Sequence, residues 1–325
     1  MQLARDTDPD LEHALRVLEQ RIGRVHARMR FDVEWDYQTQ LRDRGANHFP
    51  IENSAISARA IALALKLTGL FWRGRRNAER VELRHNTIRT DALPVMFDGF
   101  SILQLSDLHC EMSAGAMLRL AELLPSVRYD VCVLTGDFRA ATYGPDDAAL
   151  VALAELRPLL RGALYGVLGN HDTIRMVPRL EQMGIRMLLN EADVIERGGQ
   201  RLYIAGIDDA HFYRADDIDK AAAHIPRDEF SILLSHTPEI YRQAALAGFN
   251  LLLSGHTHGG QICLPGGIPM TLAAALPRRL GAGAWSYLQM HGYTSAGAGC
   301  SVVPVRFNCP PEITLHRLQR PTTGS

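Results

Sequence analysis

Residues 100–109 read FSILQLSDLH, an apolar run that ends abruptly in a cluster of polar side chains. The same pattern recurs as VCVL before TGDF (131–138), LYGVL before GNHD (164–172), FSILL before SHTPE (230–239) and LLL before SGHTH (251–258). Short apolar runs that are rich in β-branched and aromatic residues predict buried strands. Each polar cluster therefore stands at the carboxyl end of a predicted strand.

Helical patterns lie between several of these runs, over 114–127 and 145–161. Strands that alternate with helices predict an α/β fold with crossover connections, in which ligands bind beyond the carboxyl ends of the strands. We therefore expect five strand ends to bring Asp, Asn and His side chains to one edge of a sheet. Beyond this pattern, GGQ at 198–200 predicts a turn between strands, and SVVPVRF (301–307) and EITLHRL (312–318) predict two closing strands.

The polar clusters supply a set of side chains that suit a metal site. They are Asp107, His109, Asp137, Asn170, His171, His236, His256 and His258. Asp107 and His109 stand two residues apart, so on an extended segment both point to the same side and can bind one ion. His256 and His258 repeat this spacing.

Small residues precede two of these side chains. Gly136 stands before Asp137 and Gly169 before Asn170, and a glycine allows the sharp turn that projects the next side chain outward. Nitrogen and oxygen donors together suit Mn, Fe or Zn better than Ca or Mg. The set includes no Cys, which excludes a tetrathiolate zinc site.

The ordered blocks D-L-H, G-D, G-N-H-D, S-H and G-H-T-H resemble those of the calcineurin-like metallophosphoesterases, over about residues 99 to 318. The resemblance implies an α/β fold, a β-sandwich flanked by helices, and a metal-dependent phosphoric ester hydrolase. By this resemblance one ion is held by Asp107, His109, Asp137 and His258. The other is held by the bridging Asp137 with Asn170, His236 and His256.

The same resemblance implies a cofactor of two divalent metal ions, with manganese favoured over iron or zinc. Such a pair binds phosphoryl oxygens and activates a water for in-line attack on phosphorus. His171 then lies beside the phosphate instead of binding metal, where it donates a proton to the leaving oxygen or stabilises charge on the phosphoryl group.

The segments SGHTHGGQICLPG (254–266) and PVRFNCPPEI (304–313) are similar to a bacterial branch of that family. The branch contains membrane-associated phosphodiesterases and enzymes that act on lipid-linked pyrophosphates such as UDP-diacylglucosamine. The expected function is therefore a phosphodiesterase or pyrophosphatase with a lipid-linked or membrane-proximal substrate. A phosphatase for soluble monoesters or nucleotides, and a non-catalytic scaffold, are the alternatives. All expected ligand positions are filled, which favours an enzyme.

Some positions depart from the common family pattern. Cys110 and Glu111 follow the D-x-H block, where many relatives have Gly. Arg139 follows the G-D block, where it would contact a substrate phosphate or form a surface ion pair. His211, Tyr213 and His291 stand near predicted loops and are not assigned to the site.

The chain divides near residue 85 into a helical N-terminal extension, residues 1–85, and a catalytic domain, residues 86–325. Within the extension, a periodic set of apolar residues marks one face of a helix. It consists of Leu11, Leu15, Leu18, Ile22, Val25 and Met29.

Residues 56–72, ISARAIALALKLTGLFW, form the most apolar helical candidate. Arg59, Lys66 and Arg73 recur at seven-residue steps and line one narrow stripe. Two interpretations fit. The helix lies in a membrane interface, with peripheral membrane contact through residues 56–76, or it packs on the catalytic domain or a second subunit.

Composition limits the other possibilities. The 325 residues carry a formal net charge of −1, and no basic stripe crosses the catalytic region, which argues against a nucleic-acid partner. The five Cys are odd in number and form no C-x-x-C pair, which favours a reducing compartment. The first ten residues, MQLARDTDPD, lack the apolar core of a signal peptide. We therefore expect a cytoplasmic location, with peripheral contact to the inner membrane if the membrane interpretation holds.

Overall fold

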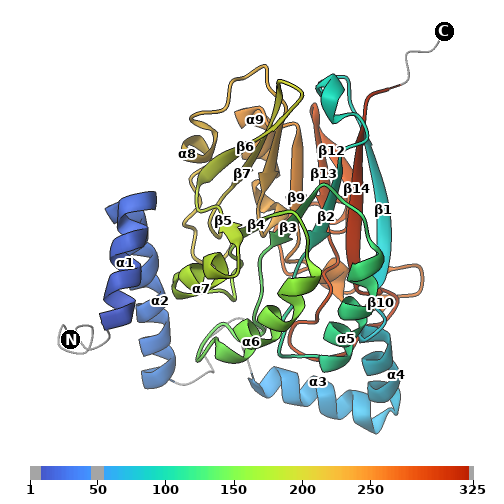
Figure 1. Cartoon of the computed structure of the whole chain (residues 1–325). Coiled ribbons are helices and arrows are strands. Elements are labelled where there is room, and N and C mark those ends of the chain that lie inside the picture. The colour runs from blue at the N-terminus through green and yellow to red at the C-terminus, as the bar shows by residue number, and fades with distance from the viewer. Residues whose placement is uncertain (1–8, 45–54, 322–325) are drawn as a thin grey trace.

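The computed structural model describes residues 9–44 and 55–321, in which two six-stranded sheets pack face to face (Figure 1). The first sheet has the order β1 (Glu82–Arg89), β14 (Glu312–Gln319), β2 (Ser101–Leu105), β3 (Val131–Thr135), β4 (Ala163–Val167) and β5 (Ile185–Met187). The second has the order β12 (Gly283–Tyr287), β13 (Met290–Thr294), β9 (Leu251–Ser254), β8 (Ser231–Leu234), β7 (Gln200–Gly206) and β6 (Glu191–Arg197).

Most neighbouring strands run parallel, as crossover connections require, but β14 is antiparallel to its neighbour β2. β2 to β5 are parallel in the first sheet, and β7, β8, β9 and β13 are parallel in the second. The predicted strands at the five polar clusters are confirmed as β2, β3, β4, β8 and β9. They do not share one sheet edge, however, because β8 and β9 belong to the second sheet. The carboxyl ends of both sheets meet at the same end of a sandwich instead.

Helices cover the outer face of each sheet, which gives every inner strand two buried sides. The helices are α5 (Ala114–Leu123), α6 (Asp147–Leu156) and α7 (Val177–Gln182) on the first sheet, and α8 (Ile218–Ala222) and α9 (Tyr241–Ala247) on the second. On β2, Ile102 packs between the sheets whereas its neighbour Leu103 packs against the helices. The predicted fold, a β-sandwich flanked by helices, is confirmed.

The two C-terminal strand predictions have different outcomes. EITLHRL forms β14, but residues 301–307 form no strand, and only Phe307 makes an isolated bridge, with Ile262. The physical reason is that side chains satisfy the backbone of this segment. The carboxamide of Gln261 donates to the carbonyls of Ser301 and Val303, at 2.8 and 3.0 Å. The predicted turn at 198–200 is confirmed as the β6–β7 hairpin.

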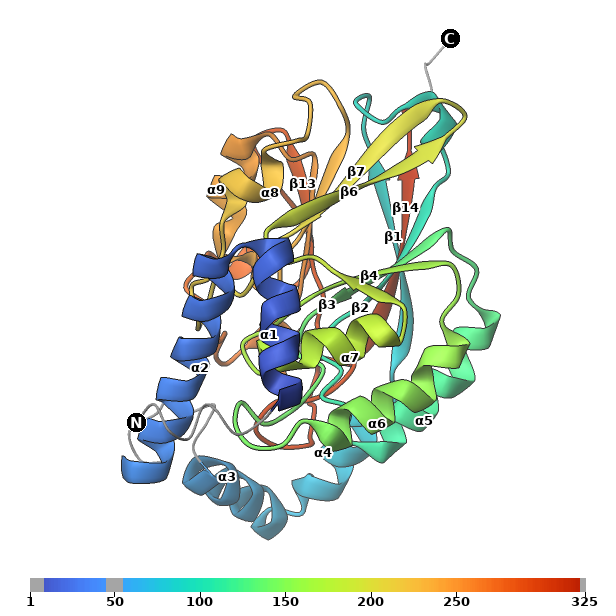
Figure 2. The same ribbon diagram turned by 60° about the vertical axis from the view of Figure 1, so that its left-hand side comes forward.

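The first predicted helix is in fact two helices that lie side by side (Figure 2). α1 (Pro9–Ile22) ends where Gly23 adopts a φ of 93°, and α2 (Arg24–Arg44) begins at the next residue. The apolar face therefore does not continue, and Val25 and Met29 are 79% and 47% exposed. α2 instead buries Ala27, Arg30 and Phe31. Leu11 lies outside the residues whose side chains are described.

A second pair of helices follows, α3 (Ala55–Leu67) and α4 (Leu70–Ala78), with a break at Gly69. Phe71 packs with Val303 and Val305 of the catalytic domain. None of the helices in the described part of the chain is both long enough and apolar enough to span a membrane. The division into residues 1–85 and 86–325 stays a prediction, and its boundary falls within β1, which pairs with β14 along its whole length.

Candidate metal centre

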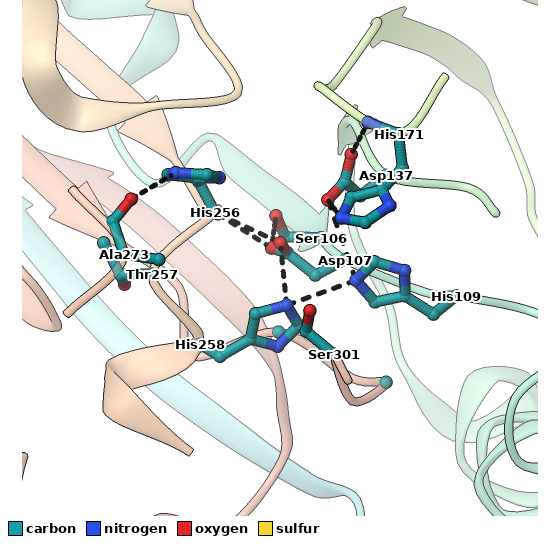
Figure 3. A network of polar contacts seen from close by, with 12 residues as sticks. Ser106, Asp107, His109, Asp137, His171, His256, Thr257, His258, Ala273 and Ser301 are labelled. Atoms are coloured by element: carbon teal, nitrogen blue, oxygen red, sulfur yellow. Dashed lines mark hydrogen bonds and ion pairs between the residues drawn. The ribbon is translucent and has the colours of Figure 1, made fainter. Parts of the chain in front are cut away.

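The loops after five strands bring the predicted site residues to one end of the sandwich. Asp107 and His109 follow β2, Asp137 follows β3, Asn170 and His171 follow β4, His236 follows β8, and His256 and His258 follow β9. All are buried, with at most 6% of any one exposed. Figure 3 shows most of them turned toward a common centre.

We call Asp107, His109 and His258 the first cluster. The Nε2 atoms of His109 and His258 lie 3.2 Å apart, and Oδ1 of Asp107 lies 3.5 Å from Nε2 of His258. One potential ligand atom from each residue lies within 4.8 Å of the others. This spacing allows the three side chains to share one cation.

The second cluster consists of Asp137, Asn170, His236 and His256. Nε2 of His236 lies 2.9 Å from Oδ1 of Asn170, 3.2 Å from Nδ1 of His256 and 3.3 Å from Oδ2 of Asp137. The same Oδ2 lies 3.7 Å from Nε2 of His109, so Asp137 stands between the clusters. Asp107 also comes within 4.8 Å of Asp137 and His236, so it lies near both clusters.

Three of the imidazoles are oriented by backbone carbonyls. Nδ1 of His109 donates to the carbonyl of Arg139 at 2.8 Å, and Nδ1 of His236 donates to that of Thr135 at 2.9 Å. Nε2 of His256 donates to the carbonyl of Ala273 at 2.8 Å. A carbonyl only accepts, so the contacted nitrogen carries a proton and the opposite ring nitrogen is turned toward the clusters. This donor set fits divalent cations.

The backbone at these residues is strained. Five of them have a positive φ: Asp107 (50°), His109 (41°), Asp137 (56°), His256 (69°) and His258 (50°). The segment from Asp107 to His109 is therefore not extended, contrary to the sequence interpretation. Non-glycine residues in this conformation cluster at functional sites, where the surroundings hold them in place.

The two glycines allow the loops to approach each other closely. A Cβ atom on Gly169 would lie 2.2 Å from Oδ1 of Asp137, and one on Gly136 would lie 2.7 Å from the backbone nitrogen of Gly169. Any larger residue at either position would push the Asp137 and Asn170 loops apart. The sequence analysis explained the two glycines by a sharp turn, which the positive φ of Gly136 (85°) supports, whereas Gly169 has no positive φ and the close approach of the loops requires it.

Comparison with known proteins shows the family to which the chain belongs. A sequence model described as Calcineurin-like phosphoesterase matches residues 100–260. The Bacillus subtilis metallophosphoesterases YkuE and YkoQ are each 30% identical to this chain, over 74% and 76% of it and over 86% and 94% of their own lengths. The chain belongs to the calcineurin-like metallophosphoesterase family. The phosphodiesterase YaeI of Escherichia coli is 28% identical, over 67% of this chain and 82% of its own.

As a calcineurin-like metallophosphoesterase, the protein is a metal-dependent phosphoester hydrolase, and its Asp and His clusters have the arrangement needed to bind two metal ions. The identity of the metal and the role of each residue stay predictions. His171 belongs to neither cluster. Its Nε2 lies 3.8 Å from Oδ2 of Asp137, and its Nδ1 lies 3.0 Å from Oγ1 of Thr142.

Burial and charge act together on the ionisable groups of this metallophosphoesterase. Burial would raise the pKa of Asp137, but the imidazoles of His236 and His171 outweigh it and hold that pKa well below its usual range. Burial opposes the charge of His236, but Asp137 outweighs it and raises the pKa of His236 to about 10. Burial lowers the pKa of His171 to about 4. The imidazole of His171 is therefore neutral at pH 7.

Two residues that support the clusters were missed by the sequence analysis. The carboxylate of Asp172 accepts N–H groups from Gly169, Asp137 and Phe138 at 2.8–2.9 Å, and so joins the loops after β3 and β4. Its place directly after G-N-H was an available signal. Arg306 is fully buried, and its Nη2 lies 3.2 Å from Nδ1 of His258. Nothing marked Arg306 in the sequence, since it stood within a predicted strand.

The polar residues that the sequence analysis left unassigned lie in different environments. Arg139 is buried and donates to the carbonyls of His171, Thr142 and Gly144, so both sequence interpretations of it were wrong. The ring of His211 lies 4.2 Å from that of His256, beside the second cluster. His291 is the second residue of β13, at the opposite end of the sheet, where its N–H bonds to the carbonyl of Asn250.

A cleft of about 510 Å³ opens beside the second cluster. It is lined by Asn170, Ala210, His211, Phe212, Arg214, Glu239, Leu272, Ala273, Ala274 and Ala275. Nδ1 of His211 lies 2.6 Å from Oε2 of Glu239, which fixes the ring at the wall of the cleft. The wall of the cleft therefore contains a cationic side chain, Arg214, and an apolar loop, residues 272–275.

Proposed function

We propose that this metallophosphoesterase is a phosphodiesterase or pyrophosphatase that acts on a lipid-linked or membrane-proximal substrate, with manganese as its metal. The cleft beside the second cluster carries the proposal. A guanidinium binds phosphate oxygens well, and Arg214 lies near apolar groups, Phe212 and Leu272, that suit an acyl or other apolar substituent. The similarity to a protein named a phosphodiesterase supports the diester chemistry.

The residues of the clusters would hold the two ions and the phosphoryl group in one orientation. Bound cations would supply Lewis acidity toward phosphoryl oxygens and an activated water. Asp137, which lies between the clusters, would contribute to both ions, and Asn170 lines the cleft. His171 would donate a hydrogen bond to a phosphoryl or leaving oxygen. Its position supports this role, since its Nε2 lies 3.8 Å from Oδ2 of Asp137 and its Nδ1 contacts Thr142.

The helices α3 and α4 support the membrane part of the proposal, a peripheral contact through residues 56–76. Leu67 and Trp72 are 80% and 65% exposed. The cations Arg59, Lys66 and Arg73 are exposed on the same pair of helices. Exposed apolar groups flanked by cationic side chains suit an interface with anionic lipids. The pairing of Phe71 with Val303 anchors these helices to the catalytic domain.

The test compares two reporters. Metal-free protein is given Mn²⁺ and assayed with bis-p-nitrophenyl phosphate and with p-nitrophenyl phosphate, with Asp137→Ala as the blank. We expect cleavage of the diester that requires both Mn²⁺ and Asp137. A preference for the monoester would contradict the proposal and favour a phosphatase for soluble monoesters or nucleotides. Absence of both activities together with absence of bound metal would favour a scaffold.

A further inference from the structure

The helix α2 contributes a buried cation, Arg30, that contacts loops of the metal centre. Arg30 is 1% exposed, and its Nη1 lies 2.5 Å from Oε1 of Glu34, one helical turn later. Its Nε donates to Oδ1 of Asp208 at 3.3 Å, and its Nη2 donates to the carbonyl of Asp172 at 3.2 Å. Figure 2 shows α2 beside α1 at one side of the sandwich.

These contacts fix the loop that carries Asn170 and His171. Arg30 binds the carbonyl of Asp172, and Glu34 accepts the N–H of Ile174 at 2.7 Å. Residues 172–174 are therefore held by α2 immediately after Asn170 and His171. The carboxylate of Asp172 in turn binds the N–H of Asp137 at 2.8 Å. A displacement of α2 would reach the second cluster through two hydrogen bonds.

The same guanidinium also fixes a loop of the other sheet. Asp208 follows β7, and the next residue, Asp209, accepts the N–H groups of Phe212 and Tyr213, each at 2.7 Å. The ring of Tyr213 lies against the guanidinium of Arg30, 3.3 Å from its central carbon. This loop carries Phe212, which lines the cleft. Arg30 thus joins the loop after β4 to the loop after β7.

Removal of one partner of a buried ion pair strongly destabilises the folded protein, because the other charge stays buried without its partner. Here the elements that Arg30 joins are one helix of the N-terminal segment and two loops that border the metal centre. The helical pattern of the sequence did not predict that α2 would contact these two loops.

We propose that Arg30 and Glu34 are positioning residues of the metal centre, so that α2 sets the affinity of the second cluster for its ion. The groups that orient metal ligands typically change metal affinity or activity by about 10- to 100-fold when removed. We expect the Arg30→Met variant to keep one tightly bound Mn²⁺ and to bind the other at least about 10-fold more weakly. The affinity of the first cluster stays close to that of the wild type.

A matched control lies on the neighbouring helix. Arg21 of α1 pairs with Glu191 at 2.6 Å and with Glu181, and it donates to the carbonyl of Met187. It anchors the helical pair to the catalytic domain without contacting either loop of the metal centre. Arg21→Ala is therefore expected to lower the Tm while both Mn²⁺ ions stay bound with wild-type affinity.

The experiment is a calorimetric titration of the full metal-free chain with Mn²⁺, accompanied by the electron paramagnetic resonance signal of the coupled Mn²⁺ pair. These readouts do not depend on which phosphoester is the substrate. Arg30→Lys, which keeps the charge beside Glu34 and Asp208, is expected to recover most of the lost affinity. Glu34→Gln, which can still accept the N–H of Ile174, gives a milder variant if Arg30→Met fails to fold. Wild-type affinity for both ions in Arg30→Met, or in Glu34→Gln if Arg30→Met does not fold, would overturn the proposal.

Discussion

His109 and His258 face each other through their Nε2 atoms at 3.2 Å, although they stand 149 positions apart in the chain and follow strands of different sheets. Metal–nitrogen bonds measure about 2.1 Å, and two ligands on one ion are then separated by about 3.0–3.4 Å in octahedral or tetrahedral geometry. The observed separation of 3.2 Å falls within this range, so both imidazoles can bind one cation. The carbonyl of Arg139 fixes the ring of His109 in that orientation.

Substitution His171→Ala should separate turnover from metal binding. His171 lies in neither cluster, so both ions should stay bound, whereas kcat for the diester reporter should fall by about 100-fold or more because a hydrogen-bond donor to the phosphoryl group is lost. Metal content by atomic emission and rate would be measured on the same sample. Loss of metal in this variant would refute the assigned role.

Mn²⁺ binding should release protons at neutral pH. The pKa of His236 is raised to about 10 by the neighbouring carboxylates against the effect of burial, so the metal-free side chain is protonated at pH 7. A ligating imidazole must be neutral, and Mn²⁺ therefore displaces this proton. The affinity for Mn²⁺ should rise with pH and level off near pH 10. Titrations in two buffers of different ionisation enthalpy give the number of protons released, and identical heats would contradict the prediction.

His316 should make the metal-free protein sensitive to acid. Burial lowers the pKa of His316 from 6.5 to about 3, while its Nε2 lies 2.9 Å from Oε1 of Gln104. Because the pKa is lower in the folded chain, the unfolded chain binds more protons between these pH values, and stability falls as the pH decreases through this window. His316→Gln should cost about 1 kcal/mol at pH 7, and the deficit should shrink toward pH 5. Urea unfolding at both pH values checks this, and a constant deficit would contradict it.

Membrane contact can be tested with two equally exposed leucines. Leu67 of α3 is 80% exposed, and Leu246 of α9 is 79% exposed. If α3 and α4 meet the lipid, Leu67→Ser combined with Trp72→Ser should reduce flotation with phosphatidylglycerol vesicles several-fold, through loss of buried apolar area. Leu246→Ser should float like the wild type. Equal flotation of all three proteins would exclude a membrane contact through these helices.

The local sequence pattern was sufficient to predict which residues form the candidate site. Each apolar run was followed by its polar cluster, and both survive in the structure as strand and loop, because a buried strand and the residue types of a metal site are both visible in a few neighbouring positions. The assignment of strands to two sheets was not predictable in this way, since a crossover to the same sheet and one to the opposite sheet have the same local pattern.

The missed features share a different cause. Arg30 and Arg306 are charged residues that long-range contacts bury, and charged residues are almost always exposed unless they are paired. The break at Gly23 was hidden because apolar residues kept their helical spacing across it. Arg30 contacts Asp208 and Asp172, which stand 178 and 142 positions away, and Arg306 contacts His258, which stands 48 positions away. At Gly23 the packing of a second helix decided the outcome.

Each cluster draws its residues from both sheets. His109 and Asn170 follow strands of the first sheet, and His258 and His236 follow strands of the second. A bound ion in either cluster would therefore cross-link the two sheets of the sandwich. Chelation would loosen the seam between the sheets at its polar end, and neither half of the chain, expressed alone, would carry a complete coordination sphere.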